Sequence, residues 1–162
     1  MSKVILLDSG PLGTIVHPKC KHEKREYDVE IREWLEYLNQ NNFELRIPEI
    51  IDYELRRNLL LENLNKSIDR LDLLQNLLIP LDRKTMLKAA QLWAEIRKQG
   101  KGGSHPKSLD GDAILLAQAI GQKDFFEKVT IVTTDLKDLS RFPNHEISIY
   151  EWPNILTNRE LI

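Results

Sequence analysis

The chain has little sulfur chemistry and no long apolar run. Its single cysteine, Cys20, excludes an internal disulfide and is typical of a protein kept in a reducing compartment. No stretch approaches the roughly 18–20 apolar residues that a membrane helix needs. The apolar residues before Asp8 are too few for the core of a signal peptide. We therefore expect a cytoplasmic protein with no membrane contact.

An excess of positive charge is also lacking. The 162 residues contain 23 Lys and Arg against 25 Asp and Glu, for a net charge of −2. This balance disfavours a strongly basic protein that wraps long nucleic acid, although it leaves room for local basic patches. Neither Gly-x-x-x-x-Gly-Lys-Ser/Thr nor Gly-x-Gly-x-x-Gly occurs, which excludes the common phosphate-cradling loops.

Short apolar segments alternate with amphipathic ones along the chain. Ile31, Trp34, Leu35 and Leu38, for example, follow the spacing of one helix face. The alternation predicts an α/β protein with a parallel sheet covered by helices on both faces. Strands are predicted at 4–7, 43–47, 78–81, 129–133 and 147–150. Helices are predicted around 31–38 and at about 48–63, 68–78, 82–97 and 109–120, with a short one from 136.

The remaining segments are predicted to be turns, loops and a tail. Ser9, Gly10 and Pro11 are turn residues that stop the first strand, and residues 17–25 and 98–108 are polar loops. Length favours one domain, over residues 1–150. Residues 151–162 are expected to form a polar, loosely attached tail. Trp34 and Trp93 lie on helical stripes, which favours the core or a subunit interface over base stacking.

Two aspartates follow predicted strands. Asp8 comes directly after the first strand, and Asp135 comes two residues after the strand at 129–133. Ligand sites of open parallel sheets lie beyond the carboxyl ends of the strands. Either residue could instead be a turn or helix-cap aspartate, because aspartate is favoured at both places.

Two further acids interrupt apolar stripes. Asp112 stands among Leu109, Ala113 and Leu116, where a buried carboxylate needs a partner. Glu54 interrupts the stripe of the helix that follows Pro48. Its alternative interpretation is a residue at the stripe edge that pairs with a neighbouring arginine.

A parallel sheet could bring Asp8, Glu54, Asp112 and Asp135 into one cleft. Clustered carboxylates repel one another, which raises their pKa values unless a metal neutralises them. Oxygen ligands without His or Cys suit Mg²⁺ or Mn²⁺. Such sites serve phosphoryl chemistry, in which the metal activates water and stabilises charge on the phosphate.

Four segments in this order resemble PIN-domain nucleases, most closely the VapC-type toxins of toxin–antitoxin pairs. VILLDSGPLG is similar to the opening strand with its first acid, and IPEIIDYELRRNL to the segment with an acid six residues after a proline. LDGDAILLAQAI is similar to the Asp-Ala-x-Ile helix, and IVTTDLKDLSRF to the closing Thr-x-Asp segment. The resemblance spans residues 3 to about 142.

The resemblance implies a three-layer α/β/α sandwich with a central parallel sheet of four or five strands. It implies a metal-dependent endoribonuclease that leaves 5′-phosphate and 3′-hydroxyl ends, pairs with a cognate antitoxin and forms a homodimer. The implied catalytic residues are Asp8, Glu54, Asp112 and Asp135. Asp8, Asp112 and Asp135 are the implied ligands of Mg²⁺ or Mn²⁺.

Some assignments within this set stay open. Asp110 is an alternative metal ligand, but it lies about 200° around a regular helix from Asp112, so both cannot face one ion. Asp138 is an alternative to Asp135 as the last acid. Ser9 and Thr133 are candidates to orient a ligand or water.

Basic residues near the predicted acids are candidates for RNA phosphate contacts. Lys98, Lys101 and Lys107 precede the Asp112 helix and could equally belong to a solvated loop. Arg56 and Arg57 could hold phosphate, pair with acids or meet an antitoxin. Two other functions remain for the chain as a whole: a non-catalytic PIN-fold module that binds nucleic acid or protein, and a structure-specific DNA nuclease.

Overall fold

The computed structural model describes residues 2–17, 28–100, 106–143 and 145–162. Its centre is a five-stranded sheet with the strand order β3-β2-β1-β4-β5, and every pairing is parallel. All carboxyl ends therefore meet at one edge. The strands are β1 (Lys3–Leu7), β2 (Phe43–Pro48), β3 (Leu78–Ile79), β4 (Lys128–Thr133) and β5 (Ser148–Glu151).

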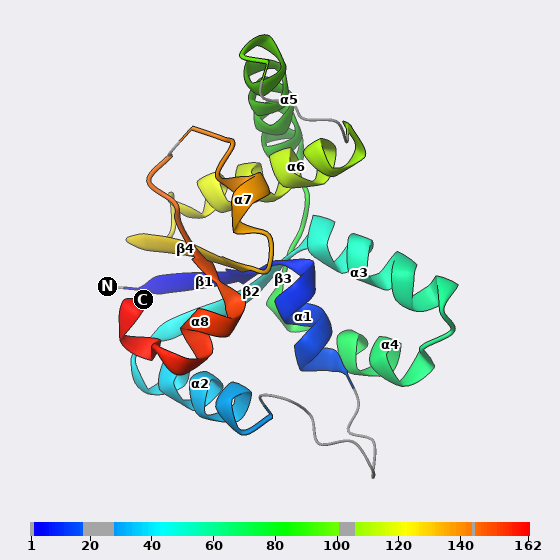
Figure 1. Ribbon diagram of the computed structural model, residues 1–162, viewed down its shortest axis with the longest axis vertical. Coiled ribbons are helices and arrows are strands. Elements are labelled where there is room, and N and C mark those ends of the chain that lie inside the picture. The colour runs from blue at the N-terminus through cyan, green and yellow to red at the C-terminus, as the bar shows by residue number, and fades with distance from the viewer. Residues whose placement is uncertain (1, 18–27, 101–105, 144) are drawn as a thin grey trace.

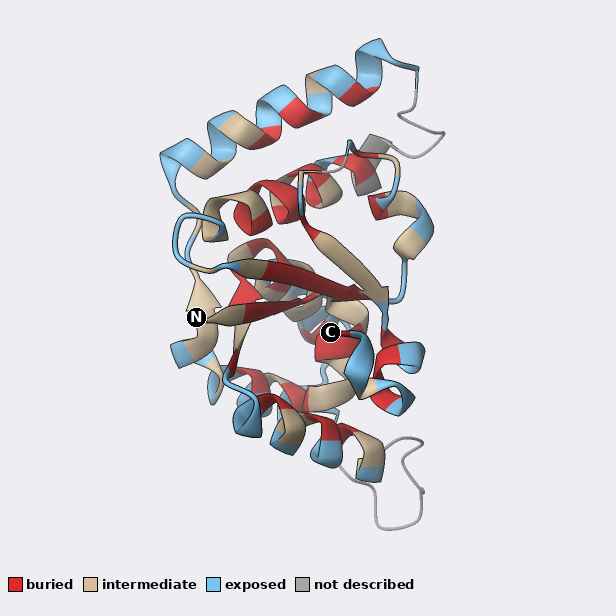
Figure 2. Ribbon diagram, turned by 90° about the vertical axis from the view of Figure 1, so that its left-hand side faces the viewer, coloured by how far each residue is buried: buried red, intermediate tan, exposed pale blue. Residues whose placement is uncertain are grey.

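Helices cover both faces of the sheet, which confirms the predicted three-layer α/β sandwich. In Figures 1 and 2, α5, α6 and α7 lie over one face, while α1, α2 and α8 lie over the other. The pair α3 and α4 extends beside the carboxyl edge. The bounds are α1 (Ser9–Val16), α2 (Asp28–Gln40), α3 (Glu49–Leu61), α4 (Asn65–Asp72), α5 (Arg83–Lys98), α6 (Pro106–Gln122), α7 (Leu136–Leu139) and α8 (Trp152–Thr157), with 3₁₀ turns η1 (Gln75–Leu77) and η2 (Arg159–Leu161).

The core includes the central strand β1 and helix α6, which other elements cover. Val4, Ile5, Leu6 and Leu7 are almost completely buried, as expected of a central strand with helices on both faces. Helix α6 lies between the sheet and α5, so its apolar residues are buried on more than one side (Figure 2).

The residues after β1 start a helix, contrary to the expected turn. The Asp8 carboxylate accepts a hydrogen bond from the backbone N–H of Ser9, at 2.7 Å, and Asp8 is the N-cap of α1. Pro11 lies in the first turn, where a missing N–H leaves no hydrogen bond unmade. Turn residues at the start of a short helix are thus indistinguishable in sequence from turn residues that only stop a strand.

Three other boundaries differ from the predictions. Helix α4 ends at Asp72, and the 3₁₀ turn η1 follows, where one helix was expected over 68–78. Helix α6 begins at Pro106, because proline suits a first turn, so the predicted loop is shorter. The predicted loop at 17–25 lies outside the described residues apart from His17, which follows α1.

The C-terminal segment is packed into the fold, which corrects the expectation of a loosely attached polar tail. Trp152, Ile155 and Leu156 of α8 are buried. The Trp152 ring meets the ring of Trp34 edge to face, with centroids 5.2 Å apart. Although the segment is polar on average, α8 therefore has a buried apolar face, which attaches it to α2.

None of the described helices combines the length and the apolar character needed to cross a bilayer.

Candidate functional site

Asp8 is held at the carboxyl end of β1 by two hydrogen bonds. Ser9 donates its backbone N–H to Oδ1, and the hydroxyl of Thr133 donates to Oδ2 at 2.6 Å. The same Thr133 oxygen accepts the N–H of Asp135 at 2.9 Å. Thr133 is completely buried at the end of β4. Its hydroxyl therefore links the Asp8 carboxylate to the turn that carries Asp135.

Glu54 reaches this edge from α3 and packs against the backbone of α6. A Cβ atom added to Gly111 would overlap the Glu54 carboxylate, so the glycine permits the close approach of this side chain to α6. Burial and the charge of Asp8 raise the pKa of Glu54 above its ordinary value, while Arg57 opposes the shift. The carboxylate of α3 thus faces that of β1.

Asp112 follows Gly111 on α6 and is largely buried. Burial and then the charge of Asp8 are the main causes that raise its pKa, to about 7, and Asp138 and Asp135 add to the shift. Arg141 opposes the shift, because its Nη2 lies 3.2 Å from Asp112 Oδ2. Asp112 therefore has several negative neighbours and one positive one.

Asp135 and Asp138 lie together at the start of α7. Desolvation and a side-chain hydrogen bond with Asp138 raise the pKa of Asp135, and Asp8 adds to the shift. Both aspartates act on Asp112, with Asp138 the stronger of the two. The two candidates for the last acid thus belong to one group. Below, the carboxylate cluster means Asp8, Glu54, Asp112, Asp135 and Asp138.

The chemistry of the carboxylate cluster fits a hard divalent cation. All donors are carboxylate oxygens, and a guanidinium already neutralises one of them. As the side chains stand, however, the described part of the chain contains no group of three Asp, Glu, His or Cys residues arranged to hold an ion. Ion binding by the cluster would therefore require side-chain rotation.

The other predicted acid and hydroxyl residues are placed as follows. Asp110 is exposed, whereas Asp112 is largely buried, as their spacing on the helix requires. Ser9 is half-buried in the first turn of α1 and supplies its backbone N–H to Asp8. Its backbone, rather than its hydroxyl, is the group seen to orient the acid.

The basic residues predicted to bind phosphate are dispersed. Arg56 pairs with Asp52 and Asp72 and so links α3 to α4. Arg57 stacks over the Tyr53 ring at 5.2 Å and acts on Glu54. Lys98 is exposed in the last turn of α5, and the Lys101 residue and the Lys107 side chain lie outside the described part.

Sequence reasoning missed Arg141. It lies after α7, and its Nε donates to the backbone oxygen of Asp138 at 3.0 Å. The available signal was its position three residues after Asp138, about one helical turn. That spacing predicts a contact with Asp138 but none with Asp112. The contact with Asp112 depends on how α7 packs beside α6.

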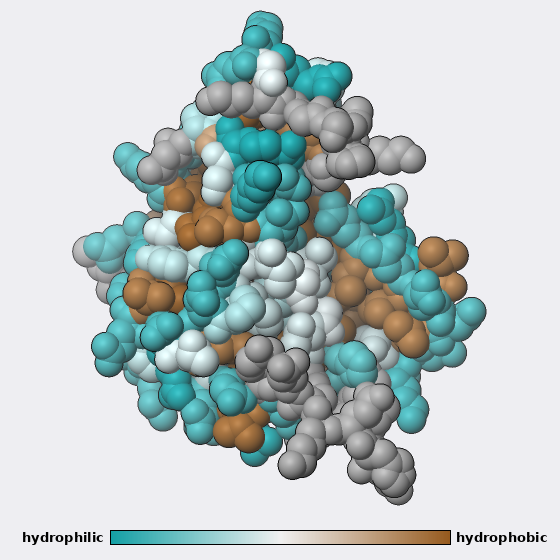
Figure 3. Space-filling view, viewed as in Figure 1, coloured by the Kyte–Doolittle hydropathy of each residue, from teal (hydrophilic) through white to brown (hydrophobic). Residues whose placement is uncertain are grey.

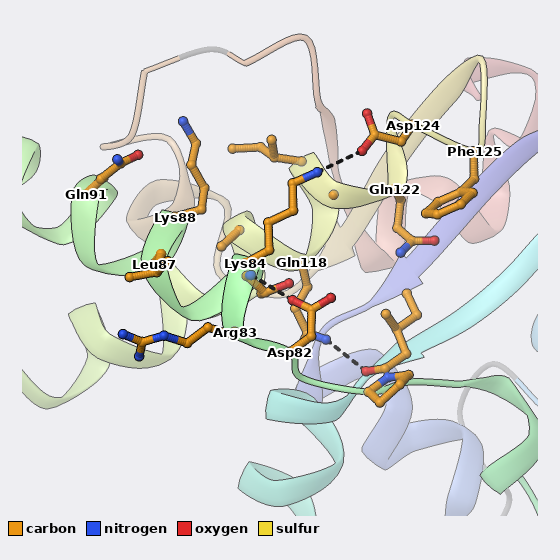
Figure 4. Close-up of a pocket in the computed structure, with 16 residues that line it drawn as sticks. Asp82, Arg83, Lys84, Leu87, Lys88, Gln91, Gln118, Gln122, Asp124 and Phe125 are labelled. Carbon is orange, nitrogen blue, oxygen red and sulfur yellow. Dashed lines mark hydrogen bonds and ion pairs between the residues drawn. The ribbon is translucent and has the colours of Figure 1, made fainter.

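A concave surface lies elsewhere, between the first half of α5 and the second half of α6 (Figure 4). Its volume is about 770 Å³. Leu87 and Phe125 are among its apolar residues, and Lys84 pairs there with Asp124. Among its described lining residues there is no member of the carboxylate cluster. The cluster therefore lies outside this groove.

Comparison with known proteins finds no matching family model and no matching curated protein. The solved structures that are similar to this chain include the following two. One is VapBC2 from Rickettsia felis bound to a DNA fragment from their promoter, with 19% identity, coverage of 92% of this chain and 98% of that chain, and a TM-score of 0.66. The other is FitAcB from Neisseria gonorrhoeae, with 19% identity, coverage of 90% and 96%, and a TM-score of 0.59. At this identity the likeness shows that the chain shares its fold, over nearly its whole length, with a chain in each of these structures.

Proposed function

We propose that this chain is a metal-dependent endoribonuclease of the PIN type that hydrolyses RNA phosphodiester bonds. One observation carries the proposal. Carboxylates from β1, α3, α6 and the start of α7 face one another at the carboxyl edge of a parallel sheet. Ligand sites in such sheets lie at this edge.

Each acid has a distinct role in this proposal. Asp8, Asp112 and Asp135 would hold Mg²⁺ or Mn²⁺, which would supply a Lewis acid that activates water and offsets phosphate charge. Thr133 fixes the Asp8 carboxylate through its hydroxyl. Glu54, whose pKa is raised, is placed to accept a proton from the attacking water.

The proposal extends to the toxin of a toxin–antitoxin pair. The four sequence segments that resemble VapC-type toxins support it, as does the fold likeness to chains in VapBC2 and FitAcB. A cognate antitoxin protein is then the expected partner. Co-purification of the chain with the product of an adjacent small reading frame is the direct check.

The test of the activity is cleavage of end-labelled single-stranded RNA by the purified chain. We expect cleavage with Mn²⁺ or Mg²⁺ and none with EDTA, and fragments that carry 5′-phosphates. Asp8→Asn should lower the rate at least about 100-fold, as loss of a group that stabilises the transition state does. Asp69→Asn, an exposed change on α4, is the control. Cleavage by Asp8→Asn at the rate of the unaltered chain would contradict the assignment.

One observation favours the second candidate, a non-catalytic binding module. In the described ranges, no three possible ligands stand close enough together to hold an ion as they are arranged. If this function is correct, the chain binds RNA or protein equally well in EDTA and cleaves nothing. The cleavage assay above distinguishes the two candidates.

A further inference from the structure

The guanidinium of Arg141 lies within the carboxylate cluster. Its Nη2 is 3.2 Å from Asp112 Oδ2, and its Nε donates to the backbone oxygen of Asp138 and lies 4.0 Å from Asp138 Oδ1. The side chains of Arg141 and Asp112 are only 19% and 21% exposed. This is a largely desolvated ion pair, in which charge matters more than it does at the surface.

The other arginines of this region are placed differently. Arg57 acts on Glu54, and Arg56 is engaged by Asp52 and Asp72. The positive charge of Arg141 lowers the pKa of Asp112. The negative charges of Asp8, Asp138 and Asp135 raise it. Removing Arg141 would therefore leave the buried carboxylate surrounded by negative charge.

We propose that Arg141 is an internal counter-cation that holds Asp112 in the absence of metal and competes with a divalent cation for this carboxylate. The inference rests on the proposed function, because it takes Asp112 as a metal ligand. A divalent ion and a guanidinium repel each other when they share a carboxylate. Binding of either one therefore weakens binding of the other, and the coupling is reciprocal. Arg141 is thus a positioning residue that sets the metal affinity.

The experiment is calorimetric titration of the whole chain with Mn²⁺. Arg141→Gln should bind Mn²⁺ about tenfold more tightly than the unaltered chain, because an opposing charge next to the ion is gone. Arg141→Lys keeps the charge and should stay within about threefold of the unaltered affinity. The matched control is Arg159→Gln, which removes an arginine paired with Glu33 on α2. Its affinity should not change.

Thermal unfolding provides a second readout. In EDTA, Arg141→Gln should melt at a lower temperature than the unaltered chain, and saturating Mn²⁺ should raise its melting temperature by a larger increment. General damage to the fold would not tighten metal binding. If Arg141→Gln does not fold, the Nε resonance of Arg141 in the unaltered chain decides: titration with Mg²⁺ should shift it, and Asp112→Asn should abolish the shift.

The possible failures are distinguishable. Arg141→Gln with unaltered or weaker affinity overturns the inference, as does an Nε resonance that Mg²⁺ leaves in place. If the unaltered chain itself binds no Mn²⁺, the metal site of the proposed function fails, and the inference fails with it. If the chain binds Mn²⁺ and Asp112→Asn does not, Asp112 is a metal ligand as proposed. The comparison of Arg141→Gln with the unaltered chain then tests the role of Arg141.

Discussion

At Asp112, burial and negative neighbours together raise the pKa of the carboxyl, and Arg141 opposes the shift. The Asp112 carboxylate is desolvated on α6, repelled by three aspartates and held by Arg141. The net result is a pKa of about 7 in the folded chain, against the ordinary value of 3.8. Because the folded state binds this proton more tightly than the unfolded state, the residue makes stability depend on pH.

In EDTA we expect the free energy of unfolding to fall as pH rises from about 4 to about 7, because the unfolded chain has released the proton and the folded chain retains it. Above pH 7 this contribution levels off. Asp112→Asn removes the contribution of this residue. At pH 8 the variant should therefore be more stable than the unaltered chain by about 1–3 kcal/mol, and at pH 4 it should have no such advantage.

Urea unfolding at pH 4, 6 and 8 in EDTA measures this effect. Asp69→Asn, on the exposed face of α4, serves as the control and should follow the unaltered chain. A parallel pH dependence in Asp112→Asn and the unaltered chain would show that Asp112 titrates normally.

At the scale of elements, the place of the Glu54 side chain against α6 depends on a single glycine. A Cβ at position 111 would overlap the flexible end of Glu54 and displace it, whereas a Cβ at Gly121 of the same helix would meet nothing within 4 Å. The two positions therefore separate the placement of Glu54 from the general effect of alanine in a helix.

We expect Gly111→Ala to lower RNA cleavage at least about tenfold with little change in melting temperature, because Glu54 must leave its position. Gly121→Ala should keep full activity and gain about 0.4–1 kcal/mol of stability, the usual effect of alanine at an unstrained helical glycine. The cleavage rate and urea unfolding of both variants check this. Equal activity of the two variants would show that Glu54 does not need its place against α6.

Helix α8 gives a second prediction at this scale. Trp152 is buried and packs edge to face on Trp34 of α2. Trp152→Ala should therefore destabilise the chain by about 3–5 kcal/mol, the range for truncating a buried tryptophan. Urea unfolding measures it, with the exposed Leu161→Ala of η2 as the neighbouring control. A loss below about 1 kcal/mol would mean that α8 is only loosely attached after all.

At the scale of the whole molecule, exposed apolar side chains gather on α3, α4 and the segments that follow them. Leu60, Leu61, Leu64 and Leu73 are between 49% and 80% exposed. Figure 3 shows apolar atoms at the surface over α3 and α4. Trp34, by contrast, is completely buried within the chain, which removes it from any subunit interface. Trp93 is partly exposed on α5 and stacks under Arg97.

We keep the prediction of a homodimer and assign it to this α3–α4 surface. A stable interface buries about 800 Å² of surface on each partner. A group of exposed leucines is the kind of apolar patch that marks such an interface. Light scattering at tens of micromolar protein should show a dimer, and the double change Leu61→Lys and Leu73→Lys should shift it to monomer without lowering the melting temperature. Leu161→Lys, elsewhere on the surface, should leave the dimer intact. A monomeric unaltered chain would refute the prediction.

Much of the fold was accessible from local patterns. The apolar run Val-Ile-Leu-Leu predicted the central strand, and the stripe through Ile31, Trp34 and Leu38 predicted α2. Helix α1 was missed because Ser-Gly-Pro suits both a turn and a first helical turn. The burial of Trp152 was missed because it depends on a partner far away in the chain.

The sequence by itself determined where most strands and helices form and which acids stand at strand ends or interrupt apolar stripes. These features follow from side-chain periodicity, which neighbouring residues set. Only the tertiary structure decided that Thr133 fixes Asp8, that Glu54 rests against Gly111 and that Arg141 pairs with Asp112. Each of these contacts joins separate elements, and their positions depend on how the helices pack on the sheet, which no local spacing records.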